Sequence, residues 1–381
     1  MEATQALWTF PAIIFAAMAI AWAAECGQFY ISQGLALAVL AWVQTLPEFA
    51  VEAVIALSAA KDPSQMHLVT ANFTGSLRLF VGFGWPMVYF VAAFFGRAKG
   101  RRMFQSISMD DENSITVLAL VPALLYFVFI YIKSTLTIAD GLILAAIYFV
   151  YLFLLSKLPA QDHEGIEDLG RIPRAIMRLP KAKSMAAIGL LFALGAWILW
   201  VAAHPFLESM LALAVMFGIS QFVFVQWFAP FLSEFPEKLS AFHWARSVKK
   251  APMALTNFVS SSINQWTILV ATVPFIYSFG VGHPAAIMFD EHQRVEILLT
   301  IIQSYLGFLF LASMDFEALE AVGLFILWAV QFFVPHWREE ITVVYAVWAG
   351  IETMRLLINY KKRNAFSAAA ALFRAHSLKG S

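Results

Sequence analysis

The chain has 381 residues, of which 61% are hydrophobic and only 13% are charged, and its mean hydropathy is +0.74. Soluble domains of this length do not have such a composition, so the sequence predicts an all-α polytopic membrane protein. The formal net charge is zero, which excludes the basic field that nucleic-acid binding needs. Cys26 is the only cysteine, so an internal disulfide is excluded, and no Cys/His spacing indicates a resident metal or another cofactor.

Five apolar runs in the first half are long enough to cross a bilayer, which takes about 20 residues in a helix. They predict helices near residues 8–25, 34–60, 67–95, 114–132 and 136–155. The first run lacks a basic N-terminal region and carries Glu2 there instead. We therefore predict a first transmembrane helix rather than a cleaved signal peptide.

A polar segment then separates this half from five more apolar runs. They predict helices near residues 185–203, 208–242, 253–279, 295–311 and 316–333. The chain thus divides into a first half at 1–157, a linker at 158–184, a second half at 185–335 and a C-terminal region at 336–381.

The linker and the C-terminal region each leave one question of interpretation. Asp162, His163 and Glu164 in the linker are interpreted as a solvated loop rather than a regulatory metal site, because the ligands are too few. Residues 341–360 predict an eleventh spanning helix followed by a basic tail. The alternative is an interfacial helix, which Glu352 and Arg355 would also allow.

Basic residues gather in the loops after the third, fifth and seventh helices, all on one side of the membrane in this count. They are Arg97, Lys99, Arg101 and Arg102; Arg171, Arg174, Arg178, Lys181 and Lys183; and Arg246, Lys249 and Lys250. Because cytoplasmic loops collect Lys and Arg, we predict an external N-terminus and a cytoplasmic linker. Each half has an odd number of helices, so the halves are predicted to be inverted repeats of five helices each.

Two segments, 44–80 and 232–266, share a pattern. The first begins Gln44-Thr45-Leu46-Pro47-Glu48 and closes with Asn72-Phe73-Thr74-Gly75-Ser76; the second begins Ser233-Glu234-Phe235-Pro236-Glu237 and closes with Asn257-Phe258-Val259-Ser260-Ser261. Helices broken at corresponding positions of two halves are typical of secondary transporters that bind their substrate between the repeats. The alternative is a chance coincidence of two Pro-Glu dipeptides, against which the shared Asn-Phe and the similar spacing argue.

Each proline frees a backbone carbonyl one turn earlier, at Val43 and at Leu232, next to an acid at membrane depth. Such an acid costs at least a few kcal/mol, so Glu48 and Glu237 are predicted to be functional rather than protonated packing residues. Two carboxylates with carbonyl, hydroxyl and amide oxygens suit a hard divalent cation such as calcium. The nearby candidate ligands are Gln44, Thr45, Asn72, Ser76, Ser233, Asn257, Ser261, Asn264 and Gln265.

The two segments resemble the alpha-1 and alpha-2 repeats of the cation/calcium exchanger superfamily, which run roughly Gly-Thr-Ser-x-Pro-Glu and then Gly-Asn-x-x-Gly-Ser-Asn. The resemblance implies ten core helices, alternating access through sliding of a two-helix gate, and Glu48 and Glu237 as the central calcium ligands. It also implies oxygen ligands from Gln44, Thr45 and Ser76 in the first repeat and from Ser233 and Ser261 in the second.

The chain departs from the family pattern at several positions. Glu234 adds a third acid, and Leu77 and Phe80 replace expected asparagines. Gln265, at a position that is acidic in the family pattern, resembles proton-coupled members more than sodium-coupled ones.

Arg78 is opposite Ile263 in the other repeat. It is interpreted as a salt-bridge strut to Glu48, Glu52 or Glu234, with snorkelling to the interface as the alternative. Glu52, one turn from Glu48, either relays protons or faces an aqueous vestibule.

The leading hypothesis is a secondary antiporter in a prokaryotic plasma membrane that exchanges calcium for protons or sodium. Its partners are then inorganic cations and the lipid bilayer, and its oligomeric state stays open. The alternatives are exchange of another divalent cation, such as magnesium or manganese, and a non-transporting protein on the same scaffold. An enzyme is not predicted, because the chain has neither a nucleophile elbow nor a His-rich zinc motif.

Overall fold

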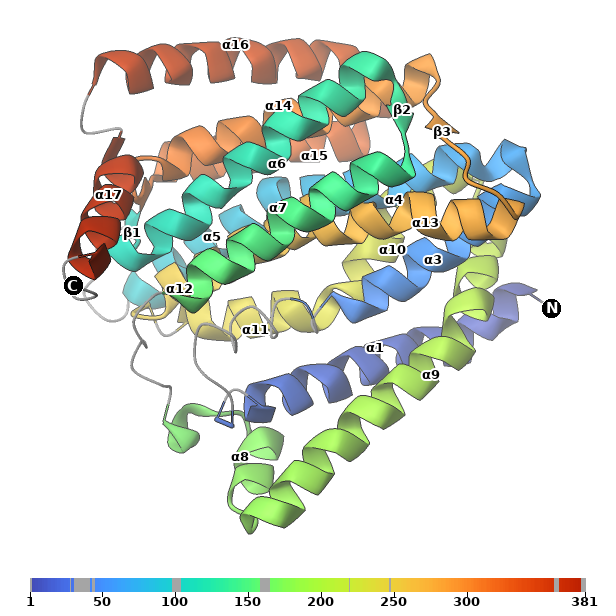
Figure 1. The fold of residues 1–381 in the computed structure, drawn as a ribbon, viewed down its shortest axis with the longest axis horizontal. Coiled ribbons are helices and arrows are strands. Elements are labelled where there is room, and N and C mark those ends of the chain that lie inside the picture. The colour runs from blue at the N-terminus through green and yellow to red at the C-terminus, as the bar shows by residue number, and fades with distance from the viewer. Residues whose placement is uncertain are drawn as a thin grey trace.

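The computed structural model describes residues 2–27, 29–30, 42, 45–97, 104–157, 165–218, 220–246, 248–359 and 363–377. These residues form a helical bundle in which most helices run roughly side by side (Figure 1). The first half contributes α1 (Glu2–Gly27), α3 (Leu46–Lys61), α4 (Met66–Leu79), α5 (Trp85–Arg97), α6 (Ser114–Lys133) and α7 (Ile138–Ser156). The linker carries α8 (Arg171–Met177).

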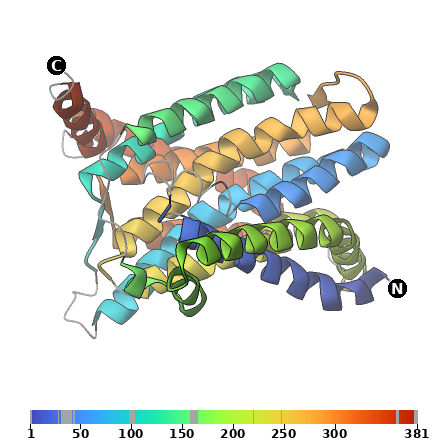
Figure 2. The same ribbon diagram turned by 60° about the horizontal axis from the view of Figure 1, so that its bottom comes forward.

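The second half repeats this order. It contributes α9 (Lys181–Met216), α10 (Gln221–Ser233), α11 (Phe235–Arg246), α12 (Ala251–Asn264), α13 (Val270–Val281), α14 (Glu291–Leu311) and α15 (Ala318–Phe333). Two further helices follow, α16 (Arg338–Ile358) and α17 (Asn364–Ser377). The first helices of the two halves, α1 and α9, pack together along one flank of the bundle, as both views show (Figure 2).

Matching interruptions of one helix in each half reflect the repeat. Single π-helical segments interrupt the third helix of each half, at Phe80–Gly84 between α4 and α5 and at Gln265–Leu269 between α12 and α13. Each begins eight residues after the asparagine of its repeat, Asn72 or Asn257. Such π-bulges are often found at functional sites, so this register marks the two motifs as equivalent.

Short two-stranded ladders join the halves at both ends of the bundle. β1 (Ile107–Ser108) pairs antiparallel with β4 (Asp315–Phe316), and β2 (Thr135–Leu136) pairs antiparallel with β3 (Ile287–Met288). Each ladder pairs one strand of the first half with one strand of the second half, so these strands connect the two repeats of the mostly helical fold.

The apolar helices follow the predicted pattern, and the outermost of them expose large side chains as lipid-facing helices do. On α6 and α7 the exposed residues include Leu125, Phe129, Phe149 and Phe153. Seven of the described helical segments are long and apolar enough to cross a membrane, among them α16. Several shorter helices, such as α10 and α11, lie on either side of a break, because a broken span consists of two half-length helices.

The predicted boundary between the sixth and seventh helices is wrong. We expected helices at 185–203 and 208–242, but α9 continues through Pro205 to Met216, and the next span consists of α10 and α11. The chain turns at Gly218, whose φ of 66° favours glycine, and Ser220 then caps α10 by accepting a hydrogen bond from the Val223 amide at 3.2 Å. The turn at Gly218 and the N-cap Ser220 therefore set the boundary between α9 and α10, whereas Pro205 lies inside α9.

The C-terminal region contains a helix that we did not predict. α17 is rich in alanine and docks on the core, where Asn364 Nδ2 donates to the Ser313 carbonyl at 3.0 Å and the Ala365 amide donates to the Ala312 carbonyl at 3.0 Å. Its buried residues are small, so no long apolar run signals it in the sequence. Of the predicted helix at 34–60, residues 34–41, 43 and 44 lie outside the described residues, as do Asp162, His163 and Glu164.

The crossing of α4 and α10 depends on Gly75. A Cβ atom built there would lie 1.8 Å from the backbone oxygen of Gln226, which cannot move aside as a flexible side chain could. We expect Gly75→Ala to destabilise the protein by about 1–3 kcal/mol, the usual cost of overpacking, and to lower its melting temperature in detergent. Gly189→Ala, on the open face of α9 where nothing lies within 4 Å of such an atom, is the matched control. Equal melting temperatures for both variants and the wild type would contradict this packing.

Candidate functional site

The candidate site lies where the broken helices of the two repeats meet. Thr45 stands at the N-cap position of α3, Pro47 occupies the first turn, and Glu48 follows with only 1% of its surface exposed. The Glu48 carboxylate accepts a hydrogen bond from Gln265 Nε2 at 2.7 Å, so the acid of the first repeat is held by the π-segment of the second. Asn264, next to Gln265, donates to Thr45 Oγ1 at 2.5 Å.

Glu234 provides the reciprocal connection. It lies at the break between α10 and α11 and accepts hydrogen bonds from Ser76 Oγ of the first repeat and from Gln265 Nε2 at 3.0 Å. Gln265 therefore bridges two acids, Glu48 and Glu234. Glu234 also lies close enough to Glu48 and Glu237 for their charges to interact. This brings three predicted acids and two predicted polar ligands to one buried region.

Glu237 and Glu52 make matching contacts in the two repeats. Asn257 Nδ2 donates to Glu237 at 3.4 Å, with Ser261 Oγ donating to the same carboxylate, and Asn72 Nδ2 donates to Glu52 at 2.6 Å. In both cases the amide follows the acid by 20 residues. Glu52 thus meets Asn72 as Glu237 meets Asn257, because α3 has 16 residues and α11 has 12, one turn fewer. Glu48 keeps the position of Glu237 directly after the proline.

Several acceptor oxygens in this region have no hydrogen-bond donor among the described residues. They are Glu48 Oε1, Glu52 Oε1, Glu237 Oε2 and Gln265 Oε1, and all are buried. Buried acceptors are normally paired, so such a set calls for a donor or a cation. No three His, Cys, Asp or Glu side chains in the described ranges stand close enough together to hold a metal ion without other ligands. A cation bound here would therefore rely on amide and hydroxyl oxygens as well as carboxylates.

The remaining predicted ligands are placed less centrally. Ser233 Oγ donates to the Pro230 carbonyl at 3.4 Å, within its own helix. Gln44 and the carbonyl of Val43 lie outside the described residues. Ser233 is therefore bonded within its own helix. The other predicted ligands that the structure describes make the contacts given above.

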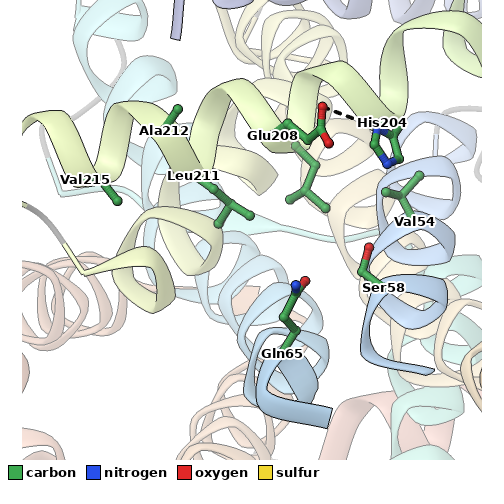
Figure 3. Close-up of a pocket in the computed structure, with 9 residues that line it drawn as sticks. Val54, Ser58, Gln65, His204, Glu208, Leu211, Ala212 and Val215 are labelled. Carbon is green, nitrogen blue, oxygen red and sulfur yellow. Dashed lines mark ion pairs between the residues drawn. The ribbon is translucent and has the colours of Figure 1, made fainter. Parts of the chain in front are cut away.

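A cavity of about 480 Å³ lies beside this region, between α3 and α9 (Figure 3). Val54 and Ser58 of α3 line it, together with His204 and Glu208 of α9, whose nearest ring nitrogen and carboxylate oxygen are 3.6 Å apart. Glu52 does not line the cavity, because its carboxylate is buried and faces Asn72. The hypothesis that Glu52 faces an aqueous vestibule is therefore wrong for this conformation, in which the acids are occluded.

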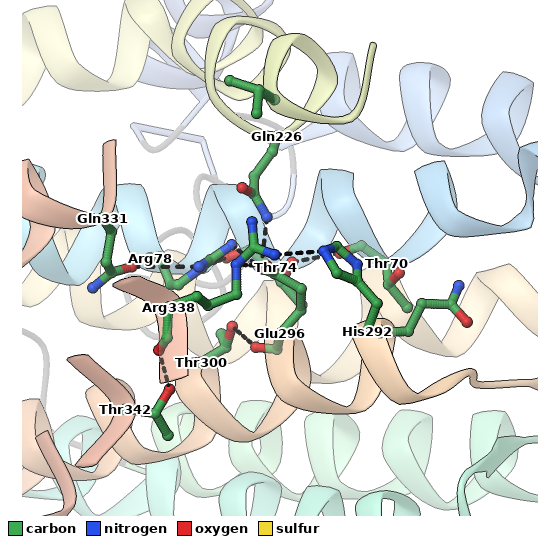
Figure 4. Close-up of polar contacts among 12 residues, drawn as sticks. Thr70, Thr74, Arg78, Gln226, His292, Glu296, Thr300, Gln331, Arg338 and Thr342 are labelled. Carbon is green, nitrogen blue, oxygen red and sulfur yellow. Dashed lines mark hydrogen bonds and ion pairs between the residues drawn. The ribbon is translucent and has the colours of Figure 1, made fainter. Parts of the chain in front are cut away.

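Arg78 is a strut, but not to the predicted acids. It is fully buried, which excludes snorkelling, and it pairs with Glu296 of α14 (Figure 4). Its other nitrogens donate to the Thr74 carbonyl at 3.2 Å and to Gln331 Oε1 at 3.3 Å. The prediction that Arg78 holds Glu48, Glu52 or Glu234 is wrong, because a helix outside the motifs supplies the carboxylate.

The Glu296 carboxylate is shared with two further partners. Arg338, at the start of α16, forms a second ion pair with it, and Gln226 of α10 donates to it at 2.7 Å. Arg338 also contacts His292 at 2.5 Å (Figure 4). This cluster fastens α4, α10, α14 and α16 together and leaves the candidate site to other residues.

Sequence reasoning missed one charged residue inside the site. Lys238 is four residues after Glu234 on α11, is 4% exposed and forms an ion pair with Glu234. A signal existed, since an acid and a lysine at i and i+4 on a helix face each other, and both lie within a predicted span. Glu296 carried no such signal, because its partners come from distant parts of the chain.

The family model described as "Sodium/calcium exchanger protein" matches residues 4–157 and 187–336. A solved structure of an H+/Ca2+ exchanger named CAX is similar with a TM-score of 0.88 and 28% identity, covering 99% of this chain and 92% of that one. A structure of the sodium-calcium exchanger NCX_Mj is similar in fold, with a TM-score of 0.56, 17% identity, and coverage of 87% of this chain and 98% of that one. The comparison with curated proteins found no match.

The cluster around Glu296 generates a stability prediction. Glu296→Gln removes the only carboxylate between two guanidinium groups, and breaking a buried ion pair in this way costs about 3–5 kcal/mol. We expect a large fall in the melting temperature of the detergent-purified protein. Glu167→Gln, which breaks an exposed pair with Arg178 on the linker, should change stability by less than about 1 kcal/mol. Similar melting temperatures for the two variants would mean that the buried cluster does not hold the helices together.

Proposed function

This chain belongs to the sodium/calcium exchanger protein family, and we propose that it is a secondary cation antiporter, not an enzyme, that exchanges calcium for protons or sodium. The observation that carries the proposal is the reciprocal crossing of the repeats at membrane depth. Glu48 is held by Gln265, and Glu234 is held by Ser76 and Gln265. A site between two inverted repeats is suited to alternating access, because movement of one repeat against the other can open the site to either side of the membrane.

Calcium would bind among the buried oxygens that lack a donor. Glu48 and Glu237 supply carboxylates, Gln265 supplies an amide oxygen, and Thr45, Asn72, Ser76, Ser233, Asn257 and Ser261 are the further proposed ligands or supports. Oxygen donors of mixed charge suit calcium, which takes six to eight of them in flexible geometry. When calcium leaves, the carboxylates cannot all stay ionised in a buried site, so protons or monovalent cations replace it.

Protons are the favoured counter-ion in this proposal. The CAX structure, described as an H+/Ca2+ exchanger, is similar over nearly the whole chain, whereas the sodium-calcium exchanger structure is similar in fold only. Gln265 adds to this argument. It is a neutral amide between Glu48 and Glu234, at a position that is acidic in the family pattern, so the site has one negative charge fewer with which to bind sodium ions. Another divalent cation such as magnesium or manganese is the alternative substrate, to be separated by competition against calcium.

We further propose that the protein lies in a prokaryotic plasma membrane with its N-terminus outside. The ends of α5 and α11 and the segment carrying α8, which all hold basic residues, lie at the same end of the bundle, and the N-terminus lies at the other (Figure 1). Positive charge gathers on the cytoplasmic side of membrane proteins. This orientation makes the linker cytoplasmic.

Transport in liposomes tests the proposal directly. We expect calcium uptake into proteoliposomes driven by an outward proton gradient, and we expect Glu48→Gln and Glu237→Gln each to reduce it to the level of empty liposomes, because each removes a proposed ligand charge. Glu291→Gln is the control, since that carboxylate is exposed and pairs only with Arg294 among the described contacts. Calcium uptake that is unchanged in both site variants would contradict the proposal. A correctly folded protein that binds no cation under any gradient would favour the non-transporting scaffold.

Binding affinity should depend on pH. Protons and calcium compete for the same carboxylate oxygens, so calcium affinity should rise with pH, by about tenfold per pH unit wherever one proton is displaced. Isothermal titration of the purified protein at two pH values measures this. An affinity that stays constant over the titration range of the buried acids would contradict proton coupling and favour sodium.

A further inference from the structure

Lys238 places a positive charge inside the candidate site. An amine at membrane depth is costly, so it must be compensated where it lies. Its Nζ forms an ion pair with Glu234, and both side chains are almost completely buried. The pair is therefore a fixed part of the site rather than a surface contact.

The surroundings of the Lys238 ammonium form a small cation-binding cage. Nζ lies 5.0 Å from the centroid of the Phe80 ring and 5.9 Å from that of Phe231. Phe80 opens the π-segment of the first repeat, Phe231 belongs to α10, and the carboxylate comes from the break that follows α10. Two aromatic faces and one carboxylate, from both halves of the protein, are the elements that bind a compact monovalent cation.

The cage shares its carboxylate with the proposed transport site. Glu234 accepts bonds from Ser76 and from Gln265, and Gln265 also holds Glu48. A free cation that bound at Glu234 would have to lie beside the ammonium. Two unit charges that close repel strongly when little water separates them.

We infer that the Lys238 ammonium is a tethered cation that occupies a monovalent-cation subsite at Glu234 and determines the ion specificity of the exchanger. The inference rests on the proposed function. A free sodium ion competes with a tethered group whose effective concentration is in the millimolar range or above. Glu234 is then a support for Lys238 rather than a calcium ligand, and calcium binds on the side of Glu48 and Glu237.

Removing the tethered charge tests this inference. Lys238→Met keeps much of the side-chain volume and leaves the Glu234 carboxylate and both aromatic rings to a free ion. We expect this variant to bind radioactive sodium with about tenfold higher affinity than the wild type, because the tethered competitor is gone. We also expect sodium, but not choline at equal ionic strength, to inhibit its calcium binding.

Two controls give the result its meaning. Lys238→Arg keeps the charge and should stay insensitive to sodium. The double variant with Glu234→Gln and Lys238→Met removes the carboxylate as well and should lose the sodium binding that the single variant gains. If Lys238→Met does not give a monodisperse protein, Lys238→Gln serves in its place.

The outcomes separate this inference from the proposed function. Sodium binding is measured directly, so it is informative even in a protein that binds no calcium. A folded Lys238→Met variant that binds no more sodium than the wild type overturns the inference. A wild type that neither binds nor transports calcium overturns the proposed function, whatever Lys238→Met does.

Discussion

The structure depends on one constraint, which is that acids beside broken helices at membrane depth must find polar partners, either in their own repeat or in the opposite one. Pro47 and Pro236 lie in the first turns of α3 and α11, next to Glu48 and Glu237, where water cannot satisfy exposed polar groups. The partners are Gln265 for Glu48 and Ser76 for Glu234, each from the other half. These two contacts join the halves at the site, so the packing of the repeats and the geometry of the site are established together.

The protein handles its buried charges in two different ways. The Glu296 carboxylate forms ion pairs with Arg78 and Arg338 and accepts a hydrogen bond from Gln226, and these contacts join four helices. In the candidate site, by contrast, one buried oxygen each of Glu48, Glu52 and Glu237 has no donor among the described residues. An unpaired buried acceptor destabilises the folded protein. A transported cation that binds these oxygens would offset this cost.

The sequence predicted the helices and the motif residues because both depend on local signals. Apolar length marks the spans, and the paired Pro-Glu and Asn-Phe segments mark the site. It did not predict where α9 ends, since Gly218 and Ser220 outweighed Pro205. It also did not predict the partner of Arg78, because a contact between residues 78 and 296 is a property of packing and leaves no periodic trace.

The repeats differ most in how their acids are arranged. The first repeat has Glu48 and Glu52 on successive turns of a longer helix, and neither pairs with a basic residue among the described contacts. The second has Glu234 and Glu237, of which Glu234 is neutralised by Lys238. The extra turn of α3 keeps an acid within reach of Asn72 while Glu48 is freed to face Gln265. The longer α3 and the presence of Lys238 thus distribute the uncompensated negative charge unevenly, with most of it on the first repeat, and this charge attracts a cation to that side.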